Sequence, residues 1–166
     1  MTERTSNLLG ALALAVTDRM HAAARETIKH AGETPAALVL IGLEPGMSND
    51  RLRRILGMSH PGTVRLVDRL VSDGLVERRP SGRDGREIAL YLTPEGQQCR
   101  STLLNNRMAV VHPLLEVLDN SEQTVLSNLL HKMLTAIPNS EIEMYTICRM
   151  CDESVCENCP LPGKCD

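Results

Sequence analysis

The sequence has no phenylalanine and no tryptophan, and only two tyrosines among its 166 residues. Its hydrophobic core must therefore be built from Leu, Val, Ile, Met and Ala, which favours helices packed through aliphatic side chains over a β-sandwich. A content of 42% hydrophobic and 23% charged residues is typical of a globular chain and excludes a disordered one. The length allows one domain of ordinary size and an appendage.

Features of secretion, membrane insertion and catalysis are also missing. The apolar run Leu8 to Val16 has no positive flank, since Glu3 offsets Arg4, and no clear small-residue cleavage site follows it. No run approaches the length of a membrane span. The sequence offers no Ser/His/Asp constellation, no phosphate-binding glycine loop and no supported acid pair. We therefore expect a cytoplasmic protein that is not an enzyme and does not contact a membrane.

The net charge of −3 conceals an uneven distribution. Nine of the fifteen arginines fall between Arg51 and Arg86, and the stretch from Asp50 to Glu87 that contains them holds six acidic residues. From Pro138 onward, six acidic residues face only Arg149 and Lys164. This pattern indicates a middle segment that can meet phosphate and a C-terminal segment that would avoid it.

Apolar periodicity and capping residues predict a mainly helical chain with one β-hairpin. Pro113 is expected to kink or split the fifth helix near Val110, and an Asn120-x-x-Gln123 pattern is expected to cap the last helix. The expected helices cover residues 6–31, 35–43, 49–56, 60–73, 94 onward and 120–137, and the expected strands cover 75–79 and 87–92.

Two of these helices are separated only by Gly57-Met58-Ser59, which matches the spacing of a helix-turn-helix, and the Arg-rich hairpin after them forms a wing. Ser59 is expected to cap the second helix, whose free N–H groups can bind phosphate. Side chains in its first turns would meet base edges, and arginine can bind guanine in a bidentate manner. The candidate DNA-binding residues are Arg51, Arg54, Ser59, His60, Pro61, Thr63, Arg65, Arg69, Arg83 and Arg86.

Four segments together resemble the MarR family of transcriptional regulators: Leu66-Val-Asp-Arg-Leu70, Gly74-Leu-Val-Glu-Arg78, Asp84-Gly-Arg86 and Leu92-Thr-Pro-Glu-Gly96. The resemblance implies a homodimer with intertwined terminal helices, in which each winged helix reads one half of a near-palindromic double-stranded operator. It also implies that the helix 60–73 enters the major groove, that Arg86 enters the minor groove and that Asp84 braces the wing. Relatives usually repress and are released by a small ligand, a metal or thiol oxidation, so a small-molecule effector is a further expected partner. Many relatives bind aromatic acids, but this chain has no Phe or Trp to line such a pocket.

The end of the chain, beyond the usual limit of the family, carries five of the six cysteines within eighteen residues: Cys148, Cys151, Cys156, Cys159 and Cys165. Two Cys-x-x-Cys pairs can supply the four thiolates of a tetrahedral zinc site. The spacing from Cys151 to Cys159 also matches three ligands of a plant-type iron–sulfur cluster. We expect four of the five to bind zinc or an iron–sulfur cluster, with redox disulfides or free thiols as a third alternative.

The sequence thus predicts a mainly α fold with a small β-wing, in two parts. Residues 1–137 form the winged-helix and dimerisation domain, with the winged helix-turn-helix at about 35–93 and dimer helices at about 6–31 and 94–137. Residues 138–166, called the tail below, form the metal- or cluster-binding part, which would stabilise the dimer or sense the redox or metal state. The alternative is an iron–sulfur redox protein that uses its winged domain for protein contacts.

Overall fold

The computed structural model describes residues 3–30, 32–81, 88–137, 140–156 and 159–161. The elements, in chain order, are α1 (Glu3–Thr27), α2 (Thr34–Leu43), β1 (Met47–Ser48), α3 (Asn49–Leu56), α4 (His60–Ser72), β2 (Val76–Pro80), β3 (Ile88–Leu92), α5 (Pro94–Leu115), α6 (Asn120–Thr135), α7 (Glu141–Ile147) and the short 3₁₀-helix η1 (Glu153–Val155). The expected mainly helical fold with a small β-wing is confirmed. None of the described helices is both long and apolar enough to cross a membrane.

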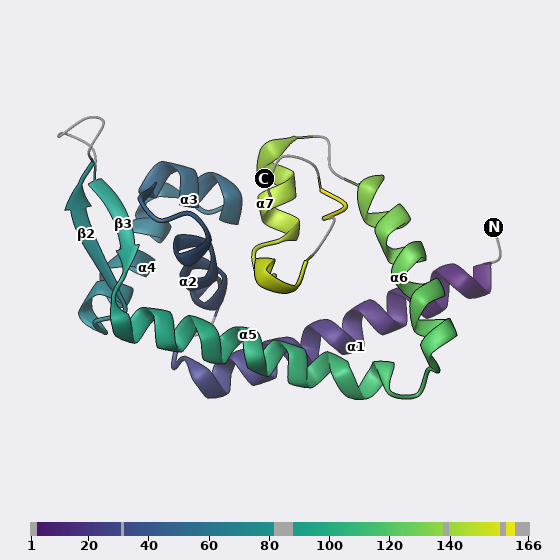
Figure 1. Ribbon diagram of the computed structural model, residues 1–166. Coiled ribbons are helices and arrows are strands. Elements are labelled where there is room, and N and C mark those ends of the chain that lie inside the picture. Colours follow the sequence, from purple (N-terminus) through teal and green to yellow (C-terminus); the bar gives the residue numbers. More distant parts are fainter. Residues whose placement is uncertain (1–2, 31, 82–87, 138–139, 157–158, 162–166) are drawn as a thin grey trace.

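A three-stranded antiparallel sheet of order β1-β3-β2 lies beside α2, α3 and α4 to form the winged domain (Figure 1). Strand β3 pairs with β2 along the hairpin and with the two-residue β1 on its other edge. The sequence did not predict β1, because a two-residue strand carries no measurable period.

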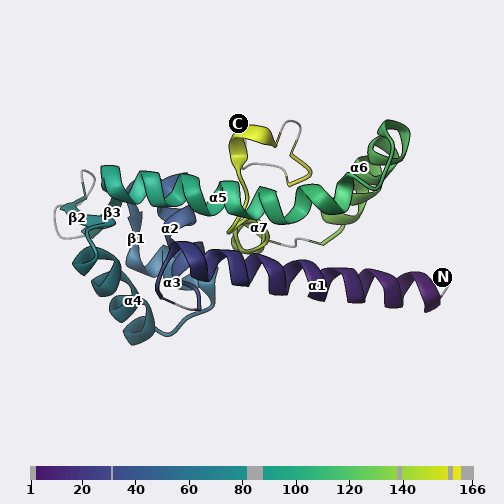
Figure 2. The same ribbon diagram turned by 90° about the horizontal axis from the view of Figure 1, so that it is seen from below.

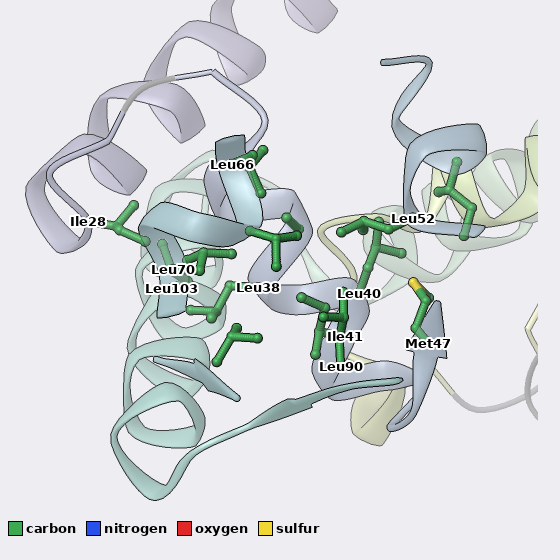
Figure 3. Close-up of a cluster of buried hydrophobic side chains, with 14 of the residues drawn as sticks. Ile28, Leu38, Leu40, Ile41, Met47, Leu52, Leu66, Leu70, Leu90 and Leu103 are labelled. Atoms are coloured by element: carbon green, nitrogen blue, oxygen red, sulfur yellow. The ribbon is translucent and has the colours of Figure 1, made fainter. Parts of the chain in front are cut away.

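The core of the winged domain is aliphatic, as the absence of Phe and Trp requires (Figure 3). Helix α2 is buried along almost its whole length, and Leu38, Leu40 and Ile41 are inaccessible to solvent. From the opposite side, α4 contributes Leu66 and Leu70 to the same cluster. Burial of such side chains contributes roughly 1.5–3 kcal/mol each, so this cluster fixes how α4 is presented.

Helices α1 and α5 extend away from the winged domain side by side, and α6 folds back from the end of α5 (Figures 1 and 2). They are called the arm helices below. Helix α5 is fixed to the winged domain at Gly96, where an added Cβ would lie 1.9 Å from the carbonyl oxygen of Leu75. Thr93 caps α5 by accepting the Gly96 N–H at 3.0 Å, and its hydroxyl donates to the Gly74 carbonyl at 2.6 Å. The glycine of the Leu-Thr-Pro-Glu-Gly segment is therefore required by a close backbone approach.

The structure corrects three predicted boundaries. Helix α1 ends at Thr27 and not at residue 31. Helix α5 continues through Pro113 to Leu115, because a proline in the last turn removes only one helical hydrogen bond. The cap of α6 is Asp119, one residue before the predicted Asn120, and it forms a reciprocal capping box with Glu122.

The tail also contains structure that the sequence did not predict. Ser140 caps α7, and Asp152 caps η1 by accepting the Ser154 N–H at 3.0 Å. Cys148 and Leu161 are both buried, at 8% and 2% exposure. In both views α7 lies between α3 and α6, so the tail is folded back towards the winged domain (Figures 1 and 2).

Candidate nucleic-acid interface

Helices α3 and α4 form the two halves of the helix-turn-helix. Helix α3 ends at Gly57, whose φ of +63° is in the left-handed region. Ser59 then caps α4 as predicted, since its hydroxyl oxygen accepts the Gly62 N–H at 3.3 Å. His60 and Pro61 are exposed beside this cap. The first turn of α4 therefore presents a narrow, accessible helix N-terminus, which attracts anions.

The outward face of α4 carries unneutralised positive charge. Arg65 and Arg69 are both exposed and lie one turn apart on the same side of the helix. Within the described parts of the chain, neither guanidinium makes a hydrogen bond or an ion pair, and the same holds for the exposed Arg54 of α3. Such side chains remain available to phosphate or to base edges.

Thr63 does not belong to this face, and its prediction as a DNA contact is wrong. Its side chain is fully buried, and its hydroxyl donates to the Ser59 carbonyl at 3.1 Å. The reason is helical phase: position 63 lies three and four residues before Leu66 and Val67, which face the core. The prediction rested on the position of Thr63 in the first turn of the helix, and the helical period places its side chain on the buried face.

Arg51 is placed differently from the other predicted arginines. Its Nε donates to Glu44 at 2.8 Å, its Nη2 donates to Glu141 at 2.7 Å, and its guanidinium lies 4.7 Å from the ring centroid of Tyr145. Burial lowers the pKa of Arg51, but the hydrogen bonds to Glu141, Glu44 and Tyr145 outweigh it, so the pKa is raised. Two carboxylates already neutralise this charge, and we omit Arg51 from the proposed DNA-contacting set.

Two further arginines, which the sequence did not single out, orient the wing. Arg78 of β2 donates to Asp68 of α4 at 2.6 Å, so the hairpin is linked directly to the outward face of α4. Arg79 pairs with Glu77, and its guanidinium lies 4.7 Å from the ring centroid of Tyr91. The Glu-Arg-Arg run at 77–79 was the available signal. The predicted wing residues Arg83, Asp84 and Arg86 lie outside the described residues.

Four of the five predicted metal-binding cysteines lie in the described part of the tail, and Cys165 does not. Cys148 and Cys151 follow α7 in a tight turn, where the Cys151 N–H donates to the Cys148 carbonyl at 2.8 Å. Cys156 directly follows η1, and Cys159 lies beyond it. Among the described residues, no three His, Cys, Asp or Glu side chains are close enough to share a metal ion.

A cavity of about 190 Å³ separates the tail from the arm helices. Met20 and His21 of α1, Arg107 of α5, and Arg149 and Cys151 of the tail contribute to its lining. The Nε of Arg107 is buried and has no hydrogen-bond partner among the described atoms. The guanidinium groups of two arginines in this lining favour an anionic or hydrogen-bond-accepting occupant.

Comparison with known proteins points to one family. Residues 34–87 match the model of the MarR family. The transcriptional regulator PetP of Rhodobacter capsulatus is 40% identical over 60 residues, which are 36% of each chain. The transcriptional repressor MprA of Escherichia coli is 30% identical over 86 residues, which are 52% of this chain and 49% of MprA. These alignments span about half or less of each relative's own length.

Solved structures match over a greater length. The apo form of MarR from E. coli has a TM-score of 0.61 and 25% identity, covering 76% of this chain and 96% of that chain. FabT from Streptococcus pneumoniae, solved in complex with DNA, has a TM-score of 0.67 and 18% identity, covering 80% of this chain and 94% of that chain. Both likenesses extend over three quarters or more of this chain, so the chain has the same fold as these two proteins.

Proposed function

Because residues 34–87 match the MarR family model and parts of the chain are 30–40% identical to two transcriptional regulators, we propose that the protein is a MarR-type transcriptional repressor that binds a near-palindromic DNA operator as a homodimer. The observation that carries this proposal is the outward face of α4, where Arg65 and Arg69 are exposed without a counter-charge among the described residues. Cationic side chains along the outward face of a helix with an accessible N-terminus fit the major groove, where arginine can bind guanine O6 and N7. FabT, of the same fold, was solved bound to DNA, which supports this assignment.

The exposed apolar residues of the arm helices support the homodimer. Leu8, Leu12 and Leu14 of α1 are 50%, 51% and 69% exposed. On α6, Val125 and Leu129 are 58% and 53% exposed. Large apolar side chains clustered on two helix surfaces favour burial against another chain, and a second copy places two α4 helices on one operator.

We further propose that the tail binds a thiolate-ligated metal centre, either zinc or an iron–sulfur cluster. The turn between Cys148 and Cys151 fits this role, because a hydrogen bond from residue i+3 to residue i keeps the two Cα atoms within about 7 Å. Thiolates are the preferred ligands of both centres. Two of Cys156, Cys159 and Cys165 would supply the remaining ligands as the tail folds around the metal, since ligation and local folding are coupled. An anionic small-molecule effector would bind in the cavity beside Arg107.

Salt-dependent binding to DNA tests the first proposal. A labelled duplex from the region upstream of the protein's own gene is titrated by fluorescence anisotropy at 50–200 mM salt, with a random duplex of equal length as control. The affinity should fall steeply with salt and should exceed that for the random duplex by roughly 10³-fold or more. Equal and weak binding to both duplexes would contradict the regulator and favour a redox protein.

Metal content tests the second proposal. The protein is purified anaerobically without chelator, and its visible spectrum and elemental composition are measured on one sample. Iron with sulfide identifies a cluster, and about one zinc per chain in colourless protein identifies a zinc site. Cys156→Ala should lower the metal content and also dimer stability or operator affinity. Wild-type protein without bound metal or cluster would refute the centre.

A further inference from the structure

The acidic tail meets the basic winged domain at α3. Glu141, at the start of α7, accepts a hydrogen bond from Arg51 Nη2 at 2.7 Å, and Tyr145, one turn later, stacks on the same guanidinium. The Thr146 hydroxyl donates to the Ile55 carbonyl of α3 at 2.8 Å. Ile142 and Tyr145 also pack against the winged-domain core. Helix α7 is thus attached to α3 by charge, by a hydrogen bond and by apolar contact.

A second attachment joins the tail to α5. Arg100 Nη2 donates to both carboxylate oxygens of Glu153 at 2.8 Å. Only 14% of the Arg100 side chain is exposed, because it passes over Gly42 of α2 and donates from Nε to the Val39 carbonyl at 3.3 Å. This arginine therefore connects an arm helix, the buried helix α2 and the tail.

Weaker contacts complete the arrangement. The Nε of Arg149 in the tail lies 3.8 Å from a carboxylate oxygen of Glu33, the residue immediately before α2. The Thr135 hydroxyl, at the end of α6, donates to the Pro160 carbonyl at 3.4 Å. The tail thereby contacts the winged domain on one side and the arm helices on the other.

We propose that the tail is a brace that fixes the winged domain relative to the arm helices, with Glu141 and Glu153 as its two charged anchors. In a homodimer the arm helices set the dimer axis, so this brace sets the separation of the two α4 helices without touching DNA. The cysteines are close to the anchors in sequence: Cys148 directly follows α7, whose first residue is Glu141, and Cys156 lies three residues after Glu153. A change in their ligation moves the anchors, and operator affinity changes with it. The inference deepens the proposed function and rests on it for the effect on DNA.

The double variant Glu141→Gln/Glu153→Gln tests the brace, because glutamine keeps the size and the hydrogen-bond acceptor of each anchor and removes its charge. Both carboxylates are well exposed, at 60% and 41%, so the fold should survive. The control Glu95→Gln/Glu116→Gln makes the same charge change at two exposed positions, one in the first turn of α5 and one directly after its last residue. Amide hydrogen exchange is followed in the full-length proteins, together with affinity for the upstream duplex.

In the double variant, amides of α7 and α3 should exchange roughly tenfold faster, the factor expected when two partly exposed ion pairs are lost. Operator affinity should fall while α5 amides remain protected, and the control should match wild type. Unchanged exchange in α7 and α3 would overturn the brace. Faster exchange with wild-type operator affinity would overturn its coupling to DNA. Wild-type protein that does not prefer the upstream duplex contradicts the proposed function instead, and the exchange result still decides whether the anchors hold the tail.

Discussion

Substitution of two nearby residues of α4 should show which face of this helix contacts DNA. Arg65 is exposed and has no ion pair among the described residues, whereas Thr63 is fully buried. Arg65→Ala should therefore change the free energy of unfolding by no more than about 0.5 kcal/mol. If the guanidinium reads a base, its loss costs about 1–3 kcal/mol of binding, which corresponds to roughly a 5- to 150-fold weaker affinity.

Thr63→Val should leave affinity unchanged and have little effect on stability. The lost hydroxyl hydrogen bond contributes about 1 kcal/mol, and the new buried methyl group returns about 0.8 kcal/mol. The Ser59 carbonyl is not left unsatisfied, because it also accepts the Thr63 backbone N–H at 3.0 Å. The expected net change is within about 1 kcal/mol.

Both variants are measured by fluorescence anisotropy on the upstream duplex and by urea unfolding, with Arg25→Ala as a charge-matched control on α1. Repeating the titration at several salt concentrations distinguishes a base contact from a phosphate contact, since loss of a phosphate contact reduces the salt slope by about one. Should Thr63→Val weaken binding more than Arg65→Ala does, the assignment of the outward face of α4 would be reversed.

Three further predictions concern packing, assembly and pH. Gly96→Ala should lower the free energy of unfolding in urea by roughly 1–3 kcal/mol, because the added Cβ would overlap the Leu75 carbonyl. Gly10→Ala, with open space around it, should instead stabilise α1 by up to about 1 kcal/mol. Leu12→Glu should make the protein monomeric in sedimentation experiments at concentrations where wild type is a dimer. Hydrogen bonds from the Ser121 hydroxyl and from backbone amides lower the pKa of Asp119. The stabilising effect of the Asp119 carboxylate should therefore persist above about pH 4 and disappear as the pH falls through its folded pKa. Asp119→Asn should remove this pH dependence from acid-unfolding curves.

Features fixed by local chemistry were predictable from the sequence. Ser59 and Thr93 cap α4 and α5 as expected, because a hydroxyl followed by free N–H groups is a short-range signal. Asp119 was missed in favour of Asn120 because both side chains are good caps and adjacent positions compete. The place of the tail was not predictable, since Glu141 and Arg51 are ninety positions apart and no local pattern encodes their contact.

The ion pairs show which arginines of the basic middle segment are already neutralised within the protein. Four of the nine arginines between positions 51 and 86 are paired with carboxylates: Arg51, Arg53, Arg78 and Arg79. Three have no such pair among the described residues: Arg54, Arg65 and Arg69. The number of arginines in the segment therefore overestimates the number available to DNA.

The acidic tail, in turn, supplies a counter-ion to the winged domain through Glu141 and to an arm helix through Glu153. From charge alone, an acidic tail that avoids DNA would be expected to lie far from a helix-turn-helix that binds DNA. Instead, α7 packs on α3, so the acidic charge of the tail helps to attach it to the winged domain. In the proposed function, a centre bound at the cysteines would therefore act on DNA affinity by changing the placement of the helices.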